Sequence, residues 1–446
     1  MDTNPAYLGQ KIEYARASLW APFYTVGMTA RIQGDVPPDL VKEILPKLQI
    51  LYPPLASRVQ IDKDGTAWLT TEGVKDCHLE VRPWTTEDDW AKTFLEQERV
   101  PFAFSKGPIA RFFLLRGATC SDLIAIVPHV IGDGYSMTLV MKEAVNLLNN
   151  PDRLVKRPSP PPAVTWQTMP HSVIDHLPLR ALLGTVNHLW PNNRTALNQD
   201  RYAELHRAYW ARQQAGFLYF KLGPEDTSQL IRQCKQHGIS VTGALIAAFL
   251  LAEVDMQPAW RPDPWKISVA MNIRERMLQP PNGAMGMYVS VVNLGMQLKA
   301  KVSFWELAHQ AHLKIHRGMN NRPHILRPLV MEQLDPSIAD SAVSAISTGR
   351  LGGKSGLLSH FLKESEDKCR LNVSNIGRIN LPEAGKPYTL ETLLPFPPLV
   401  PFSGPSLNIL TTNNQMNFIL RYHLEVWNDA TITKVRDQVI SYLRDA

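Results

Sequence analysis

Residues 122–138 read Asp-Leu-Ile-Ala-Ile-Val-Pro-His-Val-Ile-Gly-Asp-Gly-Tyr-Ser-Met-Thr, and this stretch predicts three successive elements. Its apolar run, Leu123 to Val127, is short and rich in β-branched residues, as in a strand that is covered on both faces. Pro128 cannot donate to a sheet ladder and therefore ends the strand. Beyond Gly134, apolar residues recur at helical spacing as far as Leu148. We therefore predict a buried strand, a tight polar turn and a helix.

The turn between this strand and helix carries two side chains that can do chemistry, His129 and Asp133. Gly132, Asp133 and Gly134 are residue types that suit unusual backbone geometry. An imidazole takes and returns a proton near neutral pH, and the end of a buried strand holds it rigidly. A histidine in this position is more often a core residue beside an ordinary turn, so the pattern His-x-x-x-Asp-Gly needs support from the rest of the chain.

Length and composition indicate a large globular protein. The chain of 446 residues is too long for one ordinary core, and one domain per roughly 150 residues predicts two or three units. A hydrophobic fraction of 44% and a charged fraction of 20% are typical of a folded protein. The formal net charge of +6 is scattered along the chain rather than gathered in a basic block, which argues against a nucleic-acid partner.

The cysteines and the amino terminus indicate a reduced compartment. Cys77, Cys120, Cys234 and Cys369 lie far apart without a Cys-x-x-Cys pair, so we expect neither a metal site nor a disulfide framework. The amino terminus lacks the positive start and apolar core of a signal peptide, and no apolar run approaches the roughly 18 residues of a membrane span. We expect a cytoplasmic monomer without a membrane span.

A change in composition at Pro151 divides the chain. From there to Trp166 the sequence is rich in proline, as in a stiff, extended linker, and from Pro170 to Gln214 only weak helical signals without a clear core follow. We predict a first lobe over residues 1–155, a linker and crossover segment over 156–215, and a second lobe over 216–446. Strands of the second lobe are predicted at 216–222, 265–271, 287–294, 371–378 and 418–423, and helices at 224–237, 240–253, 304–316 and 431–443. Both lobes mix strands and helices, so the fold class is α/β or α+β with two similar halves.

A second strand, Arg111 to Leu115, precedes the central strand by a short connection. If the two strands pair as a hairpin, Arg111 comes within reach of the turn, and its guanidinium fork matches the Asp133 carboxylate. An arginine on such a strand is more often a surface residue. Both interpretations stay open on the sequence alone.

Five segments, taken together in their order along the chain, resemble motifs of the superfamily of acyl-thioester-dependent acyltransferases. This superfamily includes chloramphenicol acetyltransferase and the condensation domains of nonribosomal peptide synthetases. His129 to Gly134 match its His-x-x-x-Asp-Gly signature, residues 101–111 resemble the segment before that signature in condensation domains, and residues 52–59 resemble a "Pro-x-Leu-x-x-Arg" stretch. Residues 272–274 and 374–378 resemble second-lobe motifs of alcohol acetyltransferases and polyketide-associated acyltransferases.

Two differences from known branches of this superfamily narrow the set of members that the sequence resembles. Condensation domains usually carry a second histidine directly before the catalytic one, where this chain has Pro128. Plant-type acyltransferases carry a late Asp-Phe-Gly-Trp-Gly motif, which this sequence lacks. The pattern is therefore closest to a free-standing acyltransferase that acts on an alcohol or an amine.

The resemblance implies two similar lobes with a tunnel between them and His129 near its middle. His129 would act as a general base on the hydroxyl or amine of a small-molecule acceptor and then protonate the departing thiolate. Asp133 would hold the loop by pairing with Arg111, because a buried carboxylate needs a partner, and Gly134 would supply backbone freedom. The donor would be a coenzyme A thioester or a phosphopantetheine thioester on an acyl-carrier protein, with no tightly bound cofactor and no metal.

Four further residues receive roles from the same resemblance. Ser374 or Asn375 would donate to the tetrahedral oxyanion from the opposite lobe, although a capping or turn role is equally open. Arg274 and Arg276 would contact the phosphates of coenzyme A or of a phosphopantetheine arm at the tunnel mouth. Isolated arginines more often lie solvated at the surface, and this interpretation also stays open.

Two other functions compete with acyl transfer. Gly134-Tyr-Ser136-Met-Thr138 begins like the nucleophile elbow of a serine hydrolase, but Thr138 replaces the second glycine and Ser136 falls inside the predicted helix. The other alternative is a condensation-type or scaffold module that docks a carrier protein without transfer activity of its own. Loss of the histidine would be its signature, and His129 is present.

Overall fold

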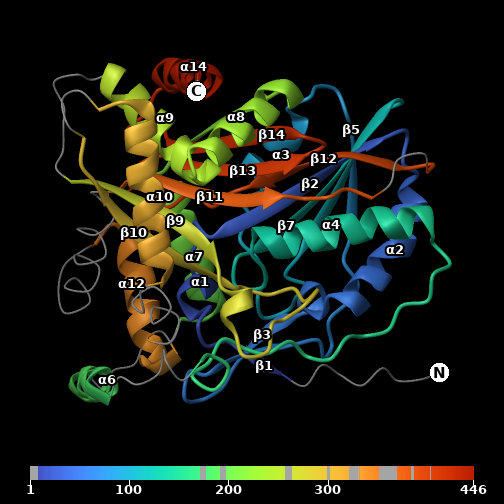
Figure 1. The fold of residues 1–446 in the computed structure, drawn as a ribbon. Coiled ribbons are helices and arrows are strands. Elements are labelled where there is room, and N and C mark those ends of the chain that lie inside the picture. Colours follow the sequence, from blue (N-terminus) through green and yellow to red (C-terminus); the bar gives the residue numbers. More distant parts are fainter. Residues whose placement is uncertain are drawn as a thin grey trace.

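Two lobes form the protein, each a mixed sheet with helices, as the sequence predicts (Figure 1). The computed structural model describes residues 9–170, 177–190, 197–256, 264–298, 302–320, 330, 332–350, 369–382, 386–401 and 403–445. The five-stranded sheet of the first lobe has the order β12-β2-β7-β6-β5, and the six-stranded sheet of the second lobe has the order β10-β9-β11-β13-β14-β8. A small third sheet, β1-β4-β3, extends the first lobe.

The elements up to residue 149 are β1 (Gln10–Lys11), α1 (Arg16–Leu19), β2 (Thr25–Gln33), α2 (Pro38–Leu51), η1 (Pro53–Ala56), β3 (Arg58–Ile61), β4 (Ala67–Thr70), β5 (Leu79–Pro83), α3 (Asp89–Gln97), β6 (Arg111–Arg116), β7 (Cys120–Pro128) and α4 (Gly134–Asn149). The elements beyond it are α6 (Leu177–Leu189), α7 (Gln199–Trp210), β8 (Ala215–Leu222), α8 (Pro224–Gln236), α9 (Val241–Met256), β9 (Trp265–Asn272), η2 (Arg274–Arg276), β10 (Val289–Met296), α10 (Phe304–Asn320), α12 (Pro336–Thr348), β11 (Cys369–Arg378), β12 (Thr389–Phe396), β13 (Ser406–Thr412), β14 (Gln415–His423) and α14 (Asp429–Asp445).

Strand β7 is the centre of the first lobe. It pairs antiparallel with β2 on one side and with β6 on the other, so the predicted hairpin with β6 is confirmed. Every residue from Ser121 to Pro128 is buried, because the strand is inside the sheet and α4 packs across β2 and β12 beside it. The predicted succession of buried strand, turn and helix is therefore confirmed, and the turn lies at the end of a rigid element.

In the second lobe, the strands and helices predicted from the sequence are present. Strand β11 pairs in parallel with both β9 and β13, which places it inside the sheet. Helix α9 has apolar residues on nearly all sides, and α8, α10 and α14 pack around it and bury them. No single described helix is long and apolar enough to cross a membrane; α8 and α9 meet that criterion only as a pair, across a bend of 105°.

Strand β12 crosses from the second lobe into the sheet of the first lobe. This strand belongs to the last third of the sequence, yet it pairs antiparallel with β2 and extends the first-lobe sheet (Figure 1). Its last residue, Phe396, stacks on Phe94 of α3 with a centroid distance of 3.6 Å and on Phe217 of β8 at 5.5 Å. The range 216–446 predicted for the second lobe thus contains a strand of the first-lobe sheet, and the lobes share a packed interface.

The crossover segment contains more core than the sequence indicated. Tyr202, Leu205, Tyr209 and Trp210 of α7 are all at least 94% buried within the first-lobe core. The interpretation of residues 170–214 as connecting structure without a clear core was therefore wrong for this helix. Its aromatic residues recur at helical spacing, and the many charged residues between them hid that signal.

Candidate active site

His129 follows the last residue of β7 and is held at the end of the sheet. Its backbone N–H donates to the carbonyl oxygen of Tyr24, directly before β2, at 2.8 Å. The Tyr24 ring meets the half-buried imidazole edge-on, with ring centroids 6.1 Å apart. The side chain therefore projects from a rigid strand end rather than from a mobile loop.

The surroundings of His129 favour its neutral form. Burial lowers the pKa of the imidazole below its ordinary value of 6.5, and the negative charge of Asp133 and nearby backbone groups of His129 and Gly132 offset this only in part. Its Nδ1 atom is buried and has no hydrogen-bond partner among the residues that the structure describes. Because a neutral imidazole can accept a proton, His129 is in the form of a general base at neutral pH.

Asp133 is buried and bound from both lobes. Its Oδ1 accepts from the Ser136 backbone N–H at 2.8 Å, which caps the start of α4. Arg274 donates to both carboxylate oxygens at 2.9 Å, and the Tyr288 backbone N–H donates to Oδ2 at 2.9 Å. Burial opposes ionisation, but the positive charge of Arg274 and these hydrogen bonds outweigh it and hold the pKa of Asp133 below its usual range. All of these contacts hold the turn against α4 and the second lobe, so the role of Asp133 in this arrangement is structural.

Arg274 joins the His129 turn to the second lobe. Its guanidinium group lies between the rings of Tyr135 and Tyr288, 5.0 and 4.6 Å from their centroids, and donates to Ser136 Oγ at 2.8 Å. The Ser136 hydroxyl donates to the Gly286 carbonyl at 2.8 Å and accepts from the Gly286 N–H at 3.1 Å. Ser136 is therefore fully engaged inside α4, which removes the arrangement that a serine nucleophile requires.

The predicted pair between Arg111 and Asp133 was wrong. Arg111 lies on β6 opposite Ile126, seven residues before the aspartate, and its side chain turns toward the end of α3. There it donates to three backbone carbonyl groups at 2.8–3.0 Å, those of Gln97, Val100 and Pro101. Its guanidinium group also lies 4.2 Å from the centre of the Phe102 ring. Arg111 thus holds the segment that leads into β6.

The phosphate-binding role expected for Arg274 was also wrong. Its side chain is only 8% exposed and its charge is neutralised by Asp133, so it cannot reach a donor at a tunnel mouth. The neighbouring Arg276 is half-buried at the end of η2. Its proposed contact with phosphate stays a prediction.

Ser374 and Asn375 lie on β11, which reaches the His129 turn from the opposite lobe. A Cβ atom at Gly134 would stand 3.0 Å from the tip of the Ile376 side chain, so a larger residue there would require this side chain to shift. The Asn375 amide donates to Thr242 Oγ1 at 3.1 Å, and its carbonyl oxygen accepts from the Gly377 N–H at 2.9 Å. These bonds favour a local structural role for Asn375, whereas the oxyanion role of either residue stays a prediction.

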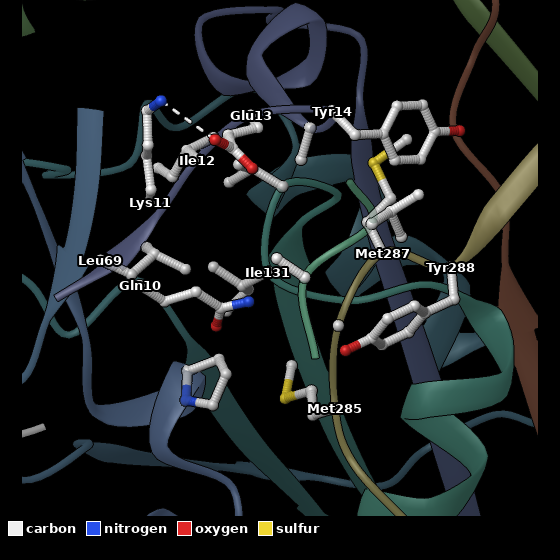
Figure 2. A pocket seen from close by; sticks show the side chains of 16 residues that line it. Gln10, Lys11, Ile12, Glu13, Tyr14, Leu69, Ile131, Met285, Met287 and Tyr288 are labelled. Carbon is white, nitrogen blue, oxygen red and sulfur yellow. Dashed lines mark ion pairs between the residues drawn. The ribbon is translucent and has the colours of Figure 1, made fainter. Parts of the chain in front are cut away.

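A cavity of about 50 Å³ lies beside the His129 turn at the lobe interface (Figure 2). Its wall includes Val130 and Ile131, the two residues after the histidine, but not His129 itself. The tunnel expected between the lobes stays a prediction. Within the described ranges, no group of three or more His, Cys, Asp or Glu side chains is placed to hold a metal ion.

The sequence alone did not reveal the contribution of residues 285–288. Gly286 and Tyr288 hold Asp133 and Ser136 mainly through backbone groups, which leave no trace in side-chain identity. The positive charge of Arg274 was visible in the sequence, but its partner lies 141 residues away. A buried carboxylate that needs a cation was the one signal that could have suggested this pair.

Over 98–99% of its length the chain shares its fold with solved structures that include a condensation domain and an acetyltransferase, which confirms the fold expected from the resemblance. Residues 211–348 match the family model described as phthiocerol/phthiodiolone dimycocerosyl transferase C-terminus. No curated protein matches the chain by sequence.

Three solved structures illustrate this likeness. Polyketide synthase associated protein 5 from Mycobacterium tuberculosis is 13% identical with a TM-score of 0.61, over 98% of this chain and 100% of that chain. Trichothecene 15-O-acetyltransferase from Fusarium sporotrichioides is 10% identical with a TM-score of 0.66, over 98% of this chain and 94% of that chain. The condensation domain from Monacolin K polyketide synthase is 11% identical with a TM-score of 0.65, over 99% and 98% of the two chains.

Proposed function

We propose that this protein is an acyltransferase of natural-product biosynthesis. It moves an acyl group from a coenzyme A or carrier-protein thioester to the hydroxyl or amine of a small-molecule acceptor. The observation that carries the proposal is the position of His129: a half-buried imidazole at a rigid strand end, in surroundings that lower its pKa, beside an aspartate whose oxygens accept from Arg274 and from backbone donors. Similarity to an acetyltransferase and to polyketide-associated proteins supports the proposed substrate class.

In the proposed reaction, His129 removes the proton of the acceptor hydroxyl or amine as that group attacks the thioester carbonyl. A new ester or amide bond forms, the carbon–sulfur bond breaks, and the proton held by His129 passes to the departing thiolate. The acyl group goes directly from donor to acceptor, so no acyl-enzyme and no serine nucleophile are required. Asp133 contributes by holding the turn, because its carboxylate is committed to Arg274.

The tetrahedral intermediate needs a hydrogen-bond donor for its oxyanion. Ser374 is the better of the two β11 candidates, because the Asn375 amide already donates to Thr242. We expect Ser374→Ala to reduce kcat by roughly 10²-fold, as for the loss of one oxyanion donor. The matched variant Asn375→Ala should reduce folding stability more than it reduces kcat.

The first experiment follows free thiol release from a set of acyl-coenzyme A and acyl-carrier thioesters with alcohol and amine acceptors. We expect His129→Ala to lower kcat by about 10²–10⁴-fold while the fold is retained. His309→Ala is the matched control, since His309 is exposed on α10. Undiminished transfer by His129→Ala would refute the base assignment. If the unmodified protein transfers no acyl group but binds a loaded carrier protein, the scaffold alternative is correct.

A further inference from the structure

The cavity beside the His129 turn is built from segments that lie far apart in the sequence, and Pro54, Leu69, Ala163 and Val164 complete its wall. The chain before α1 supplies residues 10–15, the turn supplies Val130 and Ile131, and the second lobe supplies residues 285–288. Figure 2 shows Met287 and Tyr288 on one side of the cavity and Gln10 and Leu69 on the other. Since one water needs roughly 10–15 Å³ on the same scale, a volume of about 50 Å³ holds a group of about four heavy atoms.

The walls of this cavity suit an uncharged apolar group. Ile12, Leu69, Ile131 and Met285 are all more than 90% buried and face it with aliphatic or thioether surface. Among the polar groups around it, Tyr288 donates to the Pro162 carbonyl at 3.1 Å, and Lys11 and Glu13, which both line the cavity, pair with each other at 3.0 Å. No described side chain of the wall holds a buried polar atom without a partner. A charged ligand would therefore have to compete with the Lys11–Glu13 ion pair for a counter-charge.

The cavity shares its walls with the turn that carries His129. Residues 286 and 288, which line it, also bind Asp133 through backbone hydrogen bonds of 3.2 and 2.9 Å. Met285 packs over the turn so closely that a Cβ atom at Gly132 would stand 2.9 Å from its methyl carbon. A group that fills the cavity therefore contacts Val130 and Ile131 of the turn that carries His129.

We propose that this cavity is a binding site for a small, uncharged, branched or linear alkyl group of the substrate. The group comes from the acyl chain or from the acceptor, and binding it positions the substrate against the His129 turn. This inference rests on the acyl transfer proposed above and names the substrate chemistry: an acyl donor or acceptor with a compact apolar end.

Binding can be measured without any activity. The methyl groups of Met285 and Met287 are reporters inside the cavity wall, and isotope labelling of methionine with the variants Met285→Leu and Met287→Leu assigns their NMR signals. We expect isobutanol to shift both signals saturably and protonated isobutylamine to leave them unchanged. Ala163→Leu fills the cavity from its half-buried edge and should abolish the shift, while Ala181→Leu, exposed on α6, should not.

Kinetics with the same variants identify the source of the alkyl group. A series of acyl thioesters against one acceptor, and a series of alcohols against one donor, are compared in the unmodified protein and in Ala163→Leu. We expect the KM of the substrate that fills the cavity to rise about tenfold, as for loss of about two buried methylene groups, with little change in kcat.

Each outcome decides the proposal. Absence of a saturable methyl shift, or a shift that persists in Ala163→Leu, overturns the binding site. An active enzyme in which Ala163→Leu changes neither KM overturns the assignment to the substrate. If the unmodified protein shows methyl shifts but no transfer, the apolar site stands and the proposed acyltransferase function fails.

Discussion

Asp133 and Arg274 lie 141 residues apart in the sequence, yet two hydrogen bonds of 2.9 Å join their side chains at the interface between the lobes. Both side chains are at least 92% buried. The pair fixes the start of α4, and with it the His129 turn, against the second lobe. Its geometry therefore links the fold to the position of His129.

Removal of either partner of this pair should destabilise the protein strongly. Arg274→Ala leaves the Asp133 carboxylate buried without its cation, and we expect a loss of about 3–5 kcal/mol in the free energy of unfolding. Urea denaturation of Arg274→Ala and Asp133→Ala measures it, and the half-buried Arg276→Ala should change stability by no more than about 0.5 kcal/mol. The double variant should lose less than the sum of the single losses. Strict additivity would show that the two side chains are not coupled.

The pH dependence of transfer should follow His129. The base acts in its neutral form, and its pKa lies below 6.5, so kcat/KM should be constant through neutral pH and fall only as the pH drops below about 6.5. Histidine NMR of the unliganded protein, assigned with His129→Gln, reports the same titration independently. A midpoint at or above 6.5 for His129 would contradict the proposed environment.

Arg111 should have a structural role that lysine cannot fill. Its planar guanidinium group serves three carbonyl groups at once, and a lysine ammonium cannot reproduce that geometry. Burial lowers the pKa of Arg111 to about 10, so the group is charged at neutral pH. We expect Arg111→Lys to cost at least about 2 kcal/mol of unfolding free energy. Arg116→Ala, at the exposed end of the same strand, should leave the free energy of unfolding nearly unchanged in the same urea measurement, because its ion pair with Asp35 is solvent-exposed.

His206 should make the folded state sensitive to acid. Burial lowers the pKa of this α7 side chain from 6.5 to about 4, although its hydrogen bond to the Glu98 carbonyl acts in the opposite direction. The unfolded chain therefore binds the proton first, and the stabilisation present above pH 6.5 is lost as the pH falls toward 4. The loss reaches at most about 3 kcal/mol. His206→Gln should flatten the curve of unfolding free energy against pH over this range, and an unchanged slope would assign the acid sensitivity to other groups.

The local elements of the site were predictable because they depend on short-range patterns. The apolar run before Pro128 specifies a buried strand, and the polar turn with Gly134 specifies the start of a helix, as β7 and α4 confirm. The order of five short motifs was sufficient to indicate the fold shared with the three solved structures described above. Each of these signals lies within a few residues or in the linear order of the chain.

Partners across the lobe interface could not be predicted in the same way. Arg111 and Arg274 are both arginines near polar motifs, and the sequence favoured Arg111 because its strand adjoins the turn. Only the packed structure showed that β6 places Arg111 opposite Ile126, while η2 brings Arg274 against Asp133. Likewise, β12 joins the first-lobe sheet from the far end of the chain, since sheet edges select strands by shape and burial rather than by distance in sequence.

The sequence by itself thus determined the two-lobed α/β fold and the strand-turn-helix unit that carries His129, the residue proposed as the base. Tertiary structure alone decided which cation neutralises Asp133, how Arg111 is used, and that a cavity lies beside the His129 turn. The physical reason is the sequence distance over which each effect acts: backbone propensity and apolar periodicity act between residues that are close in the sequence. A buried charge, in contrast, is stabilised by whichever partner the assembled lobes bring within hydrogen-bond distance, however far away that partner lies in the sequence.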